Sequence, residues 1–134
     1  MKYLLDTNTC VHFLRYGSKS PVAGRLTAVR PDEIALCSVV LGELLYGALR
    51  SQDEKKGISD VKKFVRRLHS LPFDDGSAAE YASIRADLAA KGTPIGPNDL
   101  LIAAIALANR LTLATHNTGE FGRVVGLALK DWQI

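Results

Sequence analysis

The chain has 134 residues, of which 47% are hydrophobic and 23% charged, with a formal net charge of +3. This size allows a core of its own, so we expect one domain spanning residues 1–134. The longest apolar run falls far short of the ~20 residues of a membrane span. An acid interrupts the apolar N-terminus, so a signal peptide is not expected. The cysteines, Cys10 and Cys37, form no disulfide pattern, which favours reduced thiols, a cytoplasmic location and no membrane partner.

Short apolar runs alternate with helical patterns, which is typical of an α/β protein with a parallel sheet. In chain order we expect a strand over 2–5, a short helix around 11–16, a helix starting at Ser20-Pro21, a strand over 33–37, and a helix capped by Ser38. An amphipathic helix over 53–68 follows, then a short strand over 71–73 and a helix from the capping box Ser77–Glu80 to Lys91-Gly92. The last elements are a helix from Gly96-Pro97 to 108, a strand over 111–115 and a strand near 128–130. We therefore expect about four to five parallel strands flanked by helices.

Four acidic residues stand beside apolar runs, where an unpaired carboxylate is costly: Asp6, Glu43, Asp99 and Glu120. Asp6 and Glu120 follow strands, and open parallel sheets bind ligands at the carboxyl ends of their strands. Glu43 and Asp99 fall near the starts of helices. Glu43 has only apolar and glycine neighbours at helical spacing, so we expect a buried acid without a local basic partner. Four converging carboxylates would repel one another, and a divalent cation would relieve that repulsion.

The chemistry of these side chains indicates which metal to expect. Carboxylate oxygens favour Mg²⁺ or Mn²⁺, whereas zinc is disfavoured because the histidines are scattered and the cysteines lack ligand spacing. Thr7, Asn8, Thr115 and Asn117 are candidates for hydrogen bonds to the acids, to metal-bound water or to phosphate, although they could simply form turns. The basic face from Lys55 to Arg67 is interpreted as a solvated helix surface in preference to a nucleic-acid track.

Four segments carry a family resemblance. They are Leu4–Asn8 (LLDTN), Ser38–Gly47 (SVVLGELLYG), Ile95–Ala104 (IGPNDLLIAA) and Thr115–Phe121 (THNTGEF). In this order they resemble the PIN-domain ribonucleases, and more narrowly the VapC toxins of bacterial toxin–antitoxin pairs. The resemblance covers the whole chain. It implies an α/β/α fold, a Mg²⁺-dependent endoribonuclease, an antitoxin partner and frequent homodimerisation.

The same resemblance implies roles for the four acids. Asp6 and Asp99 would hold the metal, and Glu43 and Glu120 would complete its shell directly or through water. The fourth acid is often Asp in PIN domains, so the longer Glu120 is a departure from the usual pattern. The motifs look most like the VapC group that cuts initiator tRNA. Specific RNA recognition also favours unpaired loops, so the expected substrate is a tRNA anticodon loop.

Two other functions remain open at the level of the sequence. A phosphatase of the haloacid dehalogenase type also places an Asp after a strand, but it usually has a second acid two residues later, where this chain has Asn8. A non-catalytic PIN module would bind RNA or protein without cleaving it. Such modules need not keep all four acids.

Overall fold

Five parallel strands form the centre of the molecule, which a computed structural model describes over residues 1–134. The strands are β1 (Tyr3–Leu5), β2 (Ile34–Cys37), β3 (His69–Leu71), β4 (Thr112–Ala114) and β5 (Leu129–Lys130), in the order β3-β2-β1-β4-β5. β1 is central, with Leu4 in register with Ala35 on one side and with Leu113 on the other. The predicted α/β class and number of strands are confirmed. The strand order reverses between β1 and β4, and such a reversal opens a crevice at the carboxyl ends of the strands.

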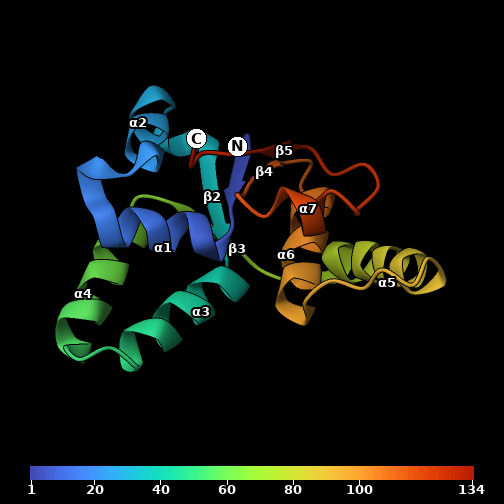
Figure 1. The fold of residues 1–134 in the computed structure, drawn as a ribbon, viewed down its shortest axis with the longest axis horizontal. Helices are drawn as coiled ribbons and strands as arrows, with labels where there is room; N and C mark the ends of the chain where they lie inside the picture. Colours follow the sequence, from blue (N-terminus) through green and yellow to red (C-terminus); the bar gives the residue numbers. More distant parts are fainter.

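Seven α-helices surround the sheet: α1 (Thr7–Tyr16), α2 (Pro21–Ala28), α3 (Ser38–Leu49), α4 (Glu54–Val65), α5 (Asp75–Ala90), α6 (Pro97–Ala108) and α7 (Thr118–Phe121). Two 3₁₀ turns, η1 (Gly17–Lys19) and η2 (Pro31–Glu33), flank α2. Figure 1 shows α1 to α4 on one side of the central strands and α5 to α7 on the other. α3 packs against α4, and α5 packs against α6. None of these helices combines the length and apolar character that crossing a membrane requires.

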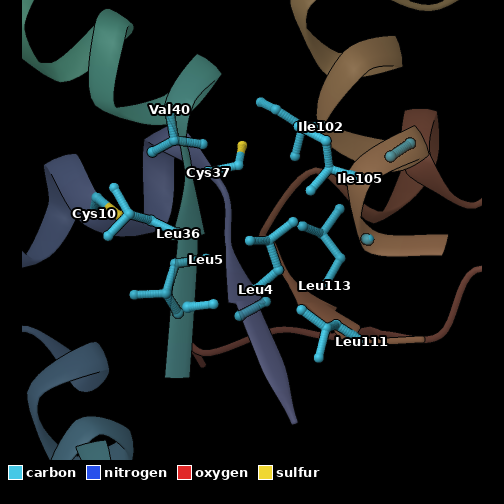
Figure 2. Packing of buried hydrophobic residues seen from close by; sticks show 14 of the residues in the cluster. Leu4, Leu5, Cys10, Leu36, Cys37, Val40, Ile102, Ile105, Leu111 and Leu113 are labelled. Carbon is cyan, nitrogen blue, oxygen red and sulfur yellow. The ribbon is translucent and has the colours of Figure 1, made fainter. Parts of the chain in front are cut away.

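The core lies on both faces of the sheet because successive strand residues point in opposite directions. Leu5 lies with Cys10 and Leu36 on the α1 side, whereas Leu4 lies towards Ile105 of α6 (Figure 2). All five of these side chains are inaccessible to solvent. Full burial on both faces explains why β1 and β2 read as continuous apolar runs rather than alternating ones.

Four local predictions were wrong. α1 starts at Thr7, four residues before the predicted start near residue 11, because Asp6 caps the helix. Ser38 does not cap α3 but is its first residue, after Cys37, whose side chain makes no capping hydrogen bond. α5 starts before the predicted capping box because Asp74 accepts hydrogen bonds from the backbone amide and the hydroxyl of Ser77, both at 2.9 Å. The third strand is His69–Leu71, slightly earlier than the predicted 71–73. The order of elements is unaffected by these shifts.

Candidate metal centre

The four acids come from four different elements. Asp6 directly follows β1 and Glu43 lies on α3, the helix that follows β2. Asp99 is in the first turn of α6, and Glu120 is in α7, which follows β4. Because β1 and β4 are neighbours at the reversal of strand order, their carboxyl ends form the floor of the candidate site.

Asp6 has a structural role as well as a position in the site. It is the N-cap of α1, and its Oδ1 accepts a hydrogen bond of 2.8 Å from the Thr9 amide. Its side chain is 3% exposed. Burial raises the pKa of Asp6, as does the negative charge of Asp131, while hydrogen bonds from Thr115 and Thr9 lower it. Asp6 therefore has hydrogen-bond donors around it but no cationic partner.

The pKa of Asp99 is raised by its surroundings in the site. Burial, and then the negative charges of Glu120, Asp6 and Glu43, together raise the pKa of Asp99 from 3.8 to about 6. The three other acids therefore lie within electrostatic range of Asp99. No ion pair in the structure includes any of them. The fold brings together the acids that the sequence indicated, and leaves their charges uncompensated.

Glu43 differs from the prediction. We expected a buried acid, but Glu43 is partly exposed, because the face of α3 that carries it is accessible to solvent. Its Oε1 accepts a hydrogen bond of 2.5 Å from the hydroxyl of Thr7 at the start of α1. Glu43 lies in no ion pair, and its hydrogen bond comes from the Thr7 hydroxyl.

The other candidates for supporting hydrogen bonds divide into two groups. The Asn117 side-chain amide donates to Oε2 of Glu120 at 2.7 Å, and the buried Thr115 hydroxyl accepts from the Asn117 backbone amide at 2.9 Å. These contacts fix α7 relative to the end of β4. Asn8, in contrast, is exposed and its side chain makes no hydrogen bond within the protein.

The donor set suits a hard divalent cation. Its oxygens are carboxylates with no cationic partner, and Asp99 accepts no hydrogen bond from any side chain. A Cβ at Gly96 would lie 3.4 Å from Oδ2 of Asp99, so glycine keeps the space beside that oxygen free. No three acidic, histidine or cysteine side chains are close enough to enclose an ion. The case for a divalent cation therefore rests on the chemistry of the carboxylates, whose oxygens are the ligands that Mg²⁺ prefers.

Two features escaped the sequence reasoning. Thr9 is fully buried, and its hydroxyl donates to the carbonyl of Ala114 at 3.0 Å, which ties α1 to the end of β4. Sequence gives no signal for this contact, because it joins residues 105 positions apart. His116 lies 2.8 Å from Asp131, a contact between residues fifteen positions apart that no local pattern reveals.

Comparisons with known proteins identify the family to which the chain belongs. The model of the PIN domain family matches residues 3–127. The chain is 36% identical to the tRNA(fMet)-specific endonuclease VapC of Salmonella typhimurium, and 37% identical to Ribonuclease VapC2 of Rickettsia felis, over 98% of each chain in both cases. The crystal structure of DNA-bound VapBC from Salmonella typhimurium superposes with a TM-score of 0.93 at 36% identity, covering 98% of both chains. VapBC2 of Rickettsia felis, bound to a promoter DNA fragment, gives a TM-score of 0.89 at 35% identity, covering 98% of this chain and 99% of the other. The chain is therefore a member of the PIN-domain family and belongs to its VapC group.

Proposed function

We propose that this chain is the toxin of a toxin–antitoxin pair, a divalent-metal-dependent endoribonuclease that hydrolyses RNA phosphodiesters. The observation that carries the proposal is the set of four uncompensated carboxylates at the reversal of strand order, centred on Asp99. The printed names of the VapC relatives, which are ribonucleases and tRNA(fMet)-specific endonucleases, support it. Membership of the PIN family also argues against the phosphatase alternative.

The proposed roles follow from the position of each acid. Asp6 and Asp99 hold Mg²⁺ or Mn²⁺, and Glu43 and Glu120 complete its shell, directly or through water. A bound divalent cation would supply an activated water and would shield phosphate charge. Thr7 and Asn117 orient the two glutamates through their hydrogen bonds. Without compensation, the four negative charges would repel an RNA phosphate, so these residues require the metal for substrate binding as well as for cleavage.

We propose a tRNA anticodon loop as the substrate, with initiator tRNA favoured. The decisive experiment incubates purified protein with total tRNA and Mg²⁺ and maps new 5′ ends. We expect cleavage at one loop position of initiator tRNA, none after chelation, and none by Asp99→Asn. Scattered cleavage of unstructured RNA with intact tRNA would contradict the substrate but not the nuclease. An intact RNA pool in excess Mg²⁺ would favour the non-catalytic alternative.

The partners are proposed on the same basis. Similar structures are VapBC assemblies, one of them described as a member of a family of toxin–antitoxin systems. We propose a VapB-type antitoxin whose arginine enters the acidic site, where a charge-assisted carboxylate pair would replace the metal. We also propose a homodimer of single-domain chains in the cytoplasm, where the two free, buried cysteines stay reduced.

A further inference from the structure

The outward face of α3 carries an aromatic–cation pair that the proposed metal chemistry does not use. Tyr46 is 61% exposed, and the Arg50 guanidinium lies over its ring, 5.1 Å from the centroid. The Tyr46 side chain makes no hydrogen bond and stacks on no other aromatic ring. Arg50 belongs to no ion pair. One face of the Tyr46 ring therefore has a cation beside it, while much of the side chain stays open to solvent.

The pair is aligned with the candidate site. Tyr46 and Arg50 follow Glu43 by three and seven residues, so they share its stripe on the helix. The rise of the helix places them about 4.5 Å and about 10 Å further along its axis. Gly42 and Gly47 flank Glu43, and a Cβ at either position would meet nothing within 4 Å. These two positions therefore place no side chain beside Glu43, which leaves room for a large ligand.

A hollow lies at the C-terminal end of α3 and is lined mainly by α4. Leu49, which is 54% exposed, lines this hollow of about 450 Å³ together with four cations, Lys55, Lys62, Lys63 and Arg66, and one acid, Glu54. None of these four cations lies in an ion pair; on α4, only Lys56 is paired with an acid, Asp60. We interpreted this basic face from sequence as a solvated surface. Its convergence on a hollow beside α3 argues instead for an anionic ligand.

We propose that Tyr46 and Arg50 are positioning residues for single-stranded RNA. An unpaired base next to the cleaved phosphodiester stacks on Tyr46, and the following phosphates lie along Arg50 and the α4 cations. Aromatic rings and arginine planes are the usual platforms for splayed RNA bases, and lysine and arginine bind the backbone. This inference rests on the proposed ribonuclease function and adds the direction in which the RNA leaves the site.

Charge distinguishes RNA from a second copy of the chain as the occupant. In a twofold dimer the same patch meets itself, so the four cations of the hollow would face their own equivalents, with Glu54 as the only acid that lines it. A phosphate backbone instead offers the complementary charge. The exposed Tyr46 and Leu49 thus lie within a surface suited to a polyanion.

Two measurements test the stacking. The first compares cleavage by Tyr46→Ala, Tyr46→Phe and the control Tyr16→Ala, which removes another exposed tyrosine, one stacked on His12. Loss of one base stack should raise KM about tenfold while kcat is retained. Phe should restore KM, and Tyr16→Ala should leave it unchanged. The second measurement uses a loop RNA with 2-aminopurine beside the cleavage position and the cleavage-deficient Asp99→Asn protein. Binding should quench the fluorescence, and adding Tyr46→Ala should abolish the quenching.

The outcomes separate this inference from the proposed function. If wild-type protein cleaves RNA while Tyr46→Ala changes neither KM nor quenching, the stacking role is overturned and the nuclease stands. If light scattering shows that Tyr46→Ala converts a dimer to a monomer with quenching unchanged, the patch is a subunit contact. If the wild type cleaves nothing, the proposed function fails, and the quenching measurement still decides whether Tyr46 stacks a base.

Discussion

Replacing Asp99 by Asn should stabilise the metal-free protein, because it removes a charge that the fold disfavours. The rise in the pKa of Asp99 from 3.8 to about 6 corresponds to about 3 kcal/mol of folding free energy. Asp99 is only half-buried, and solvent screening reduces this to about 1–2 kcal/mol. Loss of the favourable interaction with the α6 helix dipole removes a further part, about 0.3–1 kcal/mol. A net gain of about 1 kcal/mol would raise Tm by about 3–5 °C in a chain of this size.

The effect should depend on pH in a defined direction. The folded state holds the Asp99 proton more tightly than the unfolded state, so wild-type stability falls as pH rises from about 4 to about 6. The Asn variant lacks this loss. Its advantage should therefore be complete above pH 6 and disappear near pH 4. Thermal unfolding in a chelator across this range measures both effects.

A matched control removes another first-turn acid. Asp75 is exposed in the first turn of α5 and lies in no ion pair, so Asp75→Asn should leave Tm unchanged or slightly lower. If Asp99→Asn behaves like Asp75→Asn above pH 6, the carboxylates do not repel one another, and the electrostatic argument for a metal centre fails.

Substitutions at three further positions test how the acids are held. Thr7→Val removes the hydroxyl that contacts Glu43, and should lower Mg²⁺ affinity or kcat about 10- to 100-fold, measured by metal titration of cleavage. Asn117→Ala should act similarly through Glu120, and unchanged titration would exclude an orienting role. Asp6→Asn should abolish cleavage but keep the α1 cap, whereas Asp6→Ala should also lose about 1 kcal/mol in denaturant unfolding; equal stability would argue against the cap.

The fold was predictable where one physical signal dominated. β1 and β2 are buried on both faces, so their apolar runs identify them directly. The start of α5 was not predictable, because two capping patterns overlap and Asp74 bonds to the residue, Ser77, that was expected to be the cap. At such a site the choice depends on which first turn packs better.

The candidate site was predictable as a set of residues but not as a geometry. The four acids stood out because each interrupts apolar sequence. The partial exposure of Glu43 and its bond to Thr7, 36 residues away, depend on how α1 and α3 meet. Tyr46 was likewise counted among the apolar helical neighbours of Glu43, although its side chain is 61% exposed. Periodicity identifies a helix, but the neighbouring helices decide which stripe stays open.

The carbonyl of Ala114 accepts two hydrogen bonds, one from the Asp6 amide at 3.1 Å and one from the Thr9 hydroxyl at 3.0 Å. Two hydrogen bonds to one acceptor lock the first turn of α1 onto β4 before any ligand arrives. Cation binding therefore incurs little ordering entropy at this end of the site. We expect the Asp6 amide to exchange with solvent only through global unfolding. An antitoxin acting on such a preformed centre would inhibit by occupying it, and its departure would leave an enzyme ready to act without refolding.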